Sequence, residues 1–536
     1  MIETIDKIAL KAGIKNDYID QYGRYKAKID LSIFDELKNK KNGKLVLVTA
    51  ITPTKSGEGK TTMSIALAEG FAKIGVNCML ALREPSLGPV FGLKGGATGG
   101  GLASIQPADD INLHFTGDMH ALTSSINLIA AIIDNHIFQG NELNIDPTKI
   151  VWKRALDMND RALRSVTVMQ DEKKGNPRHD EFVITVASEM MAILCLASDP
   201  EDFRRRVNNI IVAYTFDDKP VYLKELKISN AIMKLMREAL KPNLVQTTEN
   251  NPTLVHGGPF ANIAHGCNSI IALKLAAKLG DVTVTEAGFG ADLGAEKFLD
   301  ICCPTAGLSP DGVVVVATIR ALKEHGGMAY EELANPNVDA LKNGVCNLKL
   351  HLENISKYGV PVVVAINHFK DDSKEEVEWL TKWCEENNYC VSFVDSFAKG
   401  GEGSIDLANK VKDMLANKKS NYHKLYDYNL PIKEKIEIIC HEIYRAGEVE
   451  FSDKALEQID RYTKLGYGKT AVCMAKTPLS ITDNPKVKGA PSGYKISIRE
   501  VNLSAGANFI VALTGKVMTM PGLPKVPAAV LMEQEK

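Results

Sequence analysis

The sequence predicts an α/β protein with a large, doubly wound and mostly parallel sheet. Residues 44–82 read as strand, helix and strand in direct succession, and similar alternation continues along most of the 536 residues. Apolar runs at 281–288, 311–318 and 360–367 lack the polar alternation of a half-exposed strand. Because both faces of such strands must be covered by helices, we expect parallel strands joined by helical crossovers.

The length of the chain suggests about three packed units. We expect a phosphate-loop (P-loop) α/β domain over residues 1–350, a second, smaller α/β domain over residues 351–495 and a small C-terminal domain over residues 496–536. A turn cluster at 334–337 predicts a hinge before the first boundary. Two strand-like runs beyond it, starting near 360 and 389, predict a separate strand–helix–strand module.

Composition favours small-molecule partners. The chain has 64 Lys and Arg against 66 Asp and Glu, which gives a formal net charge of -2. Such a charge does not predict the broad basic surface that binds nucleic acid or an anionic membrane. The N-terminus lacks the apolar core of a signal peptide, and no long uncharged apolar stretch is present. The 10 cysteines form no metal-binding spacing, so we expect buried packing and a reducing, cytoplasmic compartment.

A glycine-bearing loop lies between the first buried strand and the helix that follows it. Two glycines let backbone N–H groups converge on anionic oxygens, and the helix N-terminus adds partial positive charge. Lys60 would neutralise terminal phosphates and Thr61 would supply a hydroxyl to Mg²⁺. The predicted ATP-binding residues are Thr54, Lys55, Ser56, Gly57, Glu58, Gly59, Lys60 and Thr61. Lys55 either adds a phosphate contact or points into solvent.

Arg83 and Glu84 follow the next predicted strand, at the sheet edge where ligands collect in such folds. Arg83 is suited to clamp a carboxylate or phosphate through two hydrogen bonds, unless Glu84 satisfies it structurally. Asp118 either orients a reacting group or caps a helix that begins at His120.

Other polar segments carry weaker signals. His256 and His265 lie nine residues apart in a loop, but no third ligand is available by spacing, so we expect a site wall or a buried polar network rather than a metal centre. Cys302 and Cys303 are expected to pack in the core, with a redox or ligand role as the alternative. The glycines at 288–294 do not fit the dinucleotide-binding fingerprint, which disfavours a hydride-transfer enzyme.

Aromatic residues follow both strands of the predicted second module. Asn367 sits where a guanine-reading motif begins, but His368 and Lys370 replace the lysine and aspartate that such a motif needs. Phe369 and Phe397 either pack in the core or face each other across a flat ring.

Six long motifs resemble the formate–tetrahydrofolate ligase (formyltetrahydrofolate synthetase) family. They occur in order at 52–62, 82–101, 111–122, 255–269, 285–298 and 398–404, and the resemblance runs over nearly the whole length of the chain. The resemblance implies ATP-dependent ligation of formate to tetrahydrofolate through formyl phosphate, in one-carbon metabolism. It also implies a homotetramer that is activated by a monovalent cation, K⁺ or NH₄⁺. Formate would bind in the first domain, and the second domain would contribute to the folate site.

The resemblance also assigns roles to residues of this chain. Lys60 and Thr61, with Mg²⁺, would hold the transferring phosphoryl group, and Arg83 would bind formate and then formyl phosphate. Glu84 would be the monovalent-cation ligand. Asp118 falls in a segment near the reacting amine, and Phe369 and Phe397 match the pair that sandwiches the pterin.

The sequence departs from the family at two places. The family commonly has Trp at the position of Phe397, and Pro-Ala at the positions of Lys55 and Ser56. A smaller ring stacks less strongly, at roughly 0.5 to 1.5 kcal/mol for an aromatic pair.

Two other classes of protein use a similar loop. One is a P-loop carboxylate ligase resembling dethiobiotin synthetase, which leaves the length and the aromatic residues unexplained. The other is a switch ATPase that dimerises across its nucleotide.

Overall fold

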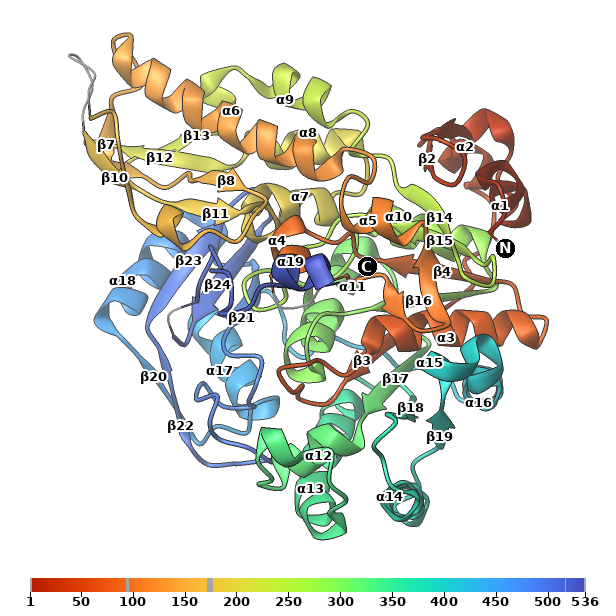
Figure 1. Ribbon diagram of the computed structural model, residues 1–536. Helices are drawn as coiled ribbons and strands as arrows, with labels where there is room; N and C mark the ends of the chain where they lie inside the picture. The colour runs from red at the N-terminus through yellow and green to blue at the C-terminus, as the bar shows by residue number, and fades with distance from the viewer. Residues whose placement is uncertain (1, 93–95, 171–176, 516, 535–536) are drawn as a thin grey trace.

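A twelve-stranded, mostly parallel sheet forms the centre of the computed structural model (Figure 1), which describes residues 2–92, 96–170, 177–515 and 517–534. Residues 93–95 of the glycine-rich motif at 82–101 therefore lie outside the described chain. Seven strands run parallel in the spatial order β15 (Pro252–Val255), β4 (Cys78–Leu82), β16 (Val282–Glu286), β3 (Lys44–Ala50), β17 (Gly312–Ala317), β18 (Val362–Asn367) and β19 (Val391–Val394). Antiparallel strands extend one side: β14 (Asn243–Thr247), β2 (Ala27–Ile29), β1 (Ile19–Gln21) and, off the main path, β6 (Ala103–Gln106) and β5 (Gly99–Gly100). The predicted fold class is confirmed at this level.

Helices cover both faces of the parallel strands. Along β17, Val314 and Val316 pack with α3 (Lys60–Lys73) and α16 (Ile405–Asn417), whereas Val313 and Val315 pack with α13 (Val338–Ser356) and α14 (Lys374–Glu386). The alternate residues of one strand therefore enter two separate cores, which explains the unbroken apolar run in its sequence.

The module predicted beyond residue 350 does not form a sheet of its own. The expected boundary falls inside α13, and β18 and β19 continue the central sheet in parallel register beside β17. A two-stranded parallel sheet buries too little to stand alone, whereas strands added to a helix-covered sheet bury both faces.

The boundary predicted near residue 495 also separates strands that pair. β21 (Ala471–Ala475) lies parallel to β24 (Phe509–Leu513), which pairs with β23 (Glu500–Ser504). β20 (Glu448–Phe451) pairs with β22 (Lys495–Ile498). These strands share one hydrophobic core with α7 (Glu189–Leu196) and with β12 (Ile211–Thr215). β12 is the middle strand of a small sheet, between β13 (Pro220–Tyr222) and β7 (Ile145–Ile150).

The end of the described chain returns to the first half of the protein. Helix α19 (Ala528–Leu531) lies beside α4 (Leu87–Phe91) near the centre of Figure 1, where the Ala528 N–H donates to the Gly92 carbonyl at 2.7 Å. Residues 519 and 520 contact the segment 160–184 through backbone and side-chain hydrogen bonds.

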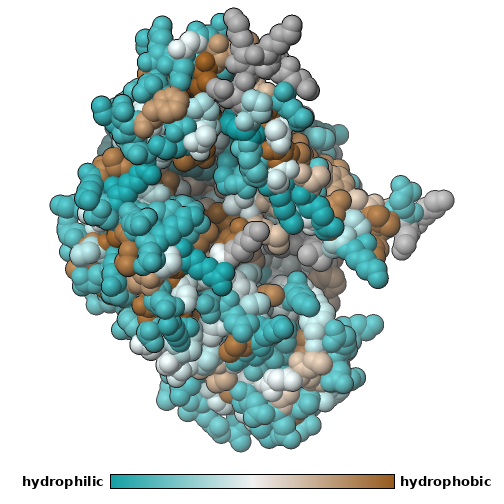
Figure 2. Space-filling view, turned by 90° about the vertical axis from the view of Figure 1, so that its left-hand side faces the viewer, coloured by the Kyte–Doolittle hydropathy of each residue, from teal (hydrophilic) through white to brown (hydrophobic). Residues whose placement is uncertain are grey.

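One described helix, α6 (Asp118–Phe138), is long and apolar enough to cross a membrane, with a mean hydropathy of 1.2 over its most apolar window. It packs against α9 (Ser229–Met236), β8 (Arg154–Leu156) and α7, and it starts at a buried, ion-paired aspartate. These contacts are those of a helix that packs by one face against the rest of the protein. On the face shown in Figure 2, hydrophobic residues lie scattered among hydrophilic ones.

A buried glutamate connects α3 to the turn between β14 and β15. Glu69 of α3 is fully buried, its Oε1 accepts from the Glu249 N–H at 3.3 Å, and its Oε2 has no hydrogen-bond partner. Burial raises the pKa of the Glu69 carboxyl to about 7; Thr247 lowers it, and the nearby Glu249 raises it further. The folded protein therefore holds a proton here that the unfolded chain releases above about pH 4.5.

Glu69→Gln is expected to change the pH dependence of stability. Because the folded-state pKa is raised, the wild-type free energy of unfolding loses this contribution as pH rises from about 4.5 to about 7. The amide does not titrate, so the variant should gain about 1 to 3 kcal/mol relative to wild type across this interval. Denaturant unfolding at several pH values measures the difference, with exposed Glu402→Gln as control. A constant difference between Glu69→Gln and wild type would contradict the assignment.

Candidate active site

The loop between β3 and α3, which the sequence predicts to bind phosphate, bends at two glycines before the helix begins. Gly57 and Gly59 adopt φ of +77° and +74°, and α3 begins at Lys60, directly after Gly59. A Cβ on Gly59 would lie 2.5 Å from the Asn367 Nδ2, whereas the position on Gly57 is open. Gly59 therefore allows the loop to pack closely against Asn367, whereas Gly57 leaves the turn at the helix N-terminus open.

Glu58 braces this loop from within. Its Oε1 accepts from the Thr54 N–H at 2.7 Å, its Oε2 accepts from the Thr318 hydroxyl, and its carbonyl accepts from the Asn367 Nδ2 at 3.1 Å. The side chain is 1% exposed. Asn367, at the end of β18, therefore supports the phosphate loop in this structure.

Thr52, two residues before the predicted loop, is held at every polar atom by buried side chains. Asn347 Oδ1 accepts from the Thr52 N–H at 3.2 Å, His351 Nε2 lies 2.9 Å from its hydroxyl, and His325 Nε2 lies 3.0 Å from its carbonyl. The carbonyl and N–H of Gly489 bind Asn347 and His325 at 2.9 and 3.1 Å. We call these five residues the Thr52 clamp. It joins the start of the phosphate loop to helices α12 (Ile319–His325) and α13 and to the C-terminal region.

Glu286 joins the phosphate loop to Arg83. It is the last residue of β16, which lies between β3 and β4 in the sheet. Its Oε2 accepts from the Thr61 hydroxyl at 2.9 Å, and its Oε1 lies 3.3 Å from the Arg83 Nη2. Arg83 thus pairs with Glu286 rather than with the adjacent Glu84, and its buried Nε has no hydrogen-bond partner among the described residues.

Gly288 leaves space for the arginine. A Cβ at this position would lie 2.9 Å from the Arg83 Nη1 and 2.8 Å from the Ala261 Cβ. The guanidinium therefore packs directly against the backbone of the loop after β16, and it retains donors for an anionic ligand.

Behind Arg83 lies a buried group of charges. The Lys28 Nζ pairs with the Asp118 Oδ1 at 2.6 Å, and both side chains are at most 1% exposed. Asn243 Nδ2 donates to the Asp118 Oδ2 at 2.7 Å, and its Oδ1 accepts from Lys28 at 2.9 Å. Helix α6 begins at Asp118, with Gly117 at its N-cap, so the predicted capping of a helix starting at His120 is wrong. The ion pair with Lys28 uses this carboxylate instead.

Glu84 is buried beside this pair without an ion-pair partner of its own among the described residues. It is 5% exposed, and its Oε2 has no hydrogen-bond partner. Burial raises the pKa of the Glu84 carboxyl well above its usual range, and the Asp118 carboxylate raises it further. Such a carboxyl holds either a proton or a cation.

The remaining predicted site residues have separate surroundings. Lys55 is exposed, with its Nζ 5.7 Å from the centre of the Tyr330 ring, and Ser56 bonds to the Tyr330 hydroxyl. Phe369 lies under the Arg320 guanidinium at 5.0 Å.

Phe397 is 60% exposed and packs on a glycine backbone: a Cβ on Gly100 would lie 3.1 Å from its ring. Phe369 and Phe397 follow the neighbouring parallel strands β18 and β19, so both stand at the sheet edge that carries the phosphate loop.

The histidine segment contributes a structural residue. His256 is fully buried between the Ser269 hydroxyl at 2.6 Å and the Ala239 carbonyl at 2.7 Å. Burial lowers the pKa of this imidazole to about 4, so it stays neutral. The structure brings His265 to Cys267 and Cys302, a grouping that sequence spacing did not reveal.

Reasoning from sequence missed Glu286, Lys28, Asn243 and the Thr52 clamp. Glu286 had a usable signal, since it is an acidic residue at the end of a buried strand, in one of the motifs described above. Lys28 and Asn243 come from short strands at the antiparallel side of the sheet and carry no local motif.

A glycine-bearing loop, an arginine and a bridging carboxylate thus meet at the edge of the parallel sheet where ligands collect in α/β proteins. A sequence model of the formate–tetrahydrofolate ligase family matches residues 1–536, the whole chain. The chain therefore belongs to this family of ligases, which act on formate and tetrahydrofolate with ATP in one-carbon metabolism.

Asn347→Ala is expected to loosen the phosphate loop. It leaves the buried Thr52 N–H and the Gly489 carbonyl without their partners, so the free energy of unfolding should fall by about 2 to 4 kcal/mol. ATP affinity should fall as well, because the clamp adjoins the loop. Denaturant unfolding and calorimetric titration measure the two effects. Exposed Asn343→Ala on the same helix is the control, and equal behaviour of the two variants would refute the role of the clamp.

Proposed function

We propose that this protein ligates formate to tetrahydrofolate at the expense of ATP, giving 10-formyltetrahydrofolate, ADP and phosphate through formyl phosphate. The observation that carries the proposal is the Glu286 carboxylate, which places Arg83 beside Thr61 of the phosphate loop. Arg83, the group proposed to bind the small carboxylate, thus lies next to Thr61, which belongs to the loop proposed to bind the terminal phosphate.

The loop residues fit ATP with Mg²⁺. The backbone at Gly57 and Gly59 and the N-terminus of α3 would receive the phosphates, with Lys60 at the first helical position. The Thr61 hydroxyl and the Glu286 carboxylate, 2.9 Å apart, are oxygen ligands of the kind Mg²⁺ prefers. Bound Mg²⁺ would supply charge neutralisation, and Glu58 and Asn367 would keep the loop in shape.

Arg83 binds formate and turns one of its oxygens toward the γ-phosphorus. That oxygen forms the new P–O bond as the bond to ADP breaks, and the guanidinium and Lys60 stabilise the charge on the transferring group. N10 of tetrahydrofolate then attacks the formyl carbon, phosphate leaves with the C–O bonding electrons, and N10 loses a proton. The donors that Arg83 retains toward a ligand support this role.

Glu84 is the proposed ligand of a monovalent cation, K⁺ or NH₄⁺. Its buried carboxyl has an oxygen without a partner, and a cation there would offset the cost of ionising it beside Asp118. Asp118 acts as a positioning residue: its ion pair with Lys28 fixes the negative charge that faces Glu84.

The folate ring is proposed to bind near Phe369 and Phe397, which follow neighbouring strands at this edge of the sheet. The 60% exposure of Phe397 leaves a ring face open for stacking. We also propose that the enzyme works in the cytoplasm as a homotetramer, as the family resemblance implies.

The test of the function is an assay for 10-formyltetrahydrofolate with formate, ATP and tetrahydrofolate omitted in turn. Product and ADP should each require all three substrates. ADP release without formate and tetrahydrofolate would point to a switch ATPase, and turnover with a different carboxylate in place of formate would point to another carboxylate ligase.

Arg83→Ala is expected to keep ATP binding and lower synthesis about 100-fold or more, because it removes the donors for the reacting carboxylate but leaves the loop intact. Calorimetry with ATP and the synthesis assay separate the two effects. Exposed Arg237→Ala is the control, and unchanged turnover of Arg83→Ala would remove Arg83 from the site.

Glu84→Gln is expected to abolish stabilisation by K⁺. In KCl, compared with tetramethylammonium chloride at equal ionic strength, the wild type should gain about 1 kcal/mol when K⁺ is several times its Kd. This stabilisation by K⁺ should increase with pH, because a carboxyl with a raised pKa exchanges its proton for the ion only at higher pH. The Gln variant should show neither effect, and an equal K⁺ gain in both proteins would rule out this ligand.

A further inference from the structure

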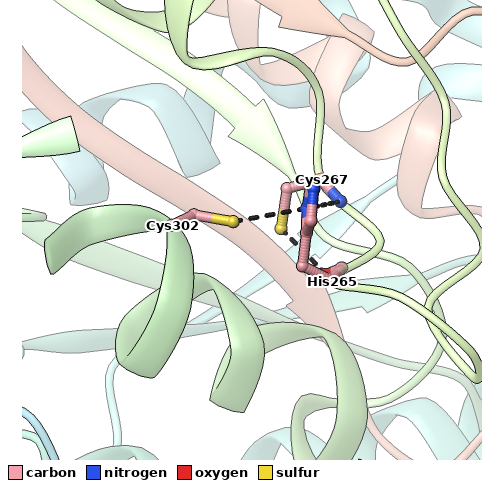
Figure 3. Close-up of side chains that lie close together, drawn as sticks. All are labelled: His265, Cys267 and Cys302. Carbon is pink, nitrogen blue, oxygen red and sulfur yellow. Dashed lines mark hydrogen bonds between the residues drawn. The ribbon is translucent and has the colours of Figure 1, made fainter. Parts of the chain in front are cut away.

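A histidine and two cysteines meet in the core next to the strand end that carries Glu286. His265 and Cys267 belong to the irregular segment 256–269, and Cys302 ends the π-helical turn Phe298–Cys302 (Figure 3). One ligand atom from each residue lies within 4.8 Å of the other two. The three side chains are 0%, 1% and 2% exposed, and the proposed ligase chemistry uses none of them.

The spacing of these atoms is suited to a tetrahedral metal ion. The Cys302 Sγ lies 3.4 Å from the His265 Nδ1. Ligand bonds of about 2.3 Å to sulfur and about 2.05 Å to nitrogen, at a tetrahedral angle, would place those two atoms about 3.6 Å apart. Only a small adjustment is therefore needed to receive an ion.

The imidazole presents a lone pair to the cluster. The Cys267 N–H donates to the His265 Nδ1 at 3.4 Å, so this nitrogen is the acceptor of the neutral ring. The Cys267 Sγ lies close by, donating to the His265 carbonyl at 3.2 Å. The opposite nitrogen, Nε2, is buried without a hydrogen-bond partner. The histidine is thus oriented by its contacts with the two cysteine residues.

We propose that His265, Cys267 and Cys302 form a binding site for a thiophilic divalent cation of the Zn²⁺ type. Two thiolates and one neutral imidazole are the ligand types that select such ions. Binding releases the two thiol protons, and the two thiolates then balance the charge of the ion, so a neutral unit is buried. Water would complete the coordination.

The site is linked to the proposed reaction centre. The segment 256–269 has no regular secondary structure between β15 and α10 (Ile270–Leu279), and most of its residues are buried. Cys267 forms a β-bridge with Ala287, and the Gly288 N–H donates to the Gly266 carbonyl at 3.0 Å. The bound ion would therefore hold the segment against the residues that follow Glu286.

The first test measures Zn²⁺ binding by the full chain against a chromophoric chelator, with metal content determined by mass spectrometry. The wild type should retain one Zn²⁺ per chain, and Cys267→Ser and Cys302→Ser should each lose at least about 10-fold in affinity. Cys303→Ser is the matched control: it is adjacent, equally buried and outside the cluster. Equal Zn²⁺ affinity in all four proteins would overturn the proposal.

A second test needs no variant and so covers the case in which a serine variant fails to fold. Co²⁺ bound to the wild type should give a thiolate-to-metal charge-transfer band and the visible bands of tetrahedral cobalt, and Zn²⁺ should abolish both. Co²⁺ bound without a thiolate band, or no Co²⁺ bound, would refute the site. These readouts are independent of ligase activity.

Discussion

One buried carboxylate organises the proposed reaction centre. The loops that follow β3 and β4 begin at strands that are not neighbours in the sheet, because β16 lies between these two strands. Glu286 ends this middle strand and binds the Thr61 hydroxyl on one side and the Arg83 guanidinium on the other. In open parallel sheets, ligands bind at the carboxyl ends of the strands, where the strand order reverses. Glu286 at this edge holds the Arg83 guanidinium and the proposed phosphate loop in one geometry before any substrate binds.

The other buried carboxylates near the site are held in different ways. Both carboxylate oxygens of Glu58 accept a hydrogen bond, one from a backbone N–H and one from a hydroxyl, so its charge stabilises the loop. Asp118 is compensated by Lys28 at 2.6 Å. Glu84 has neither kind of partner at its Oε2 among the described residues, and burial together with the nearby Asp118 carboxylate raises its pKa. Removing one partner from a buried pair costs far more than the pair contributes, which is why these groups tolerate little change.

The sequence was sufficient to predict features that depend on nearby residues. The strands, the glycine loop and Arg83 at a strand end follow from local patterns, and the structure shows β3, β4 and β16 near the predicted runs. Features that depend on strand order were not predictable. Lys28 and Asn243 lie 90 and 125 residues from Asp118, and Cys302 lies 37 residues from His265. The separate second module was expected because its strands form a local unit, yet burial of both their faces places them in the central sheet.

The Thr52 clamp has a consequence for biosynthesis. Thr52 is synthesised long before its partner Asn347, which in turn binds Gly489, and the Gly92 carbonyl accepts from the N–H of Ala528. A nascent chain can form several of the parallel strands while these groups still face water. The proposed phosphate loop gains its full support only after residue 489 has been synthesised, so a shorter nascent chain is poorly equipped to consume ATP.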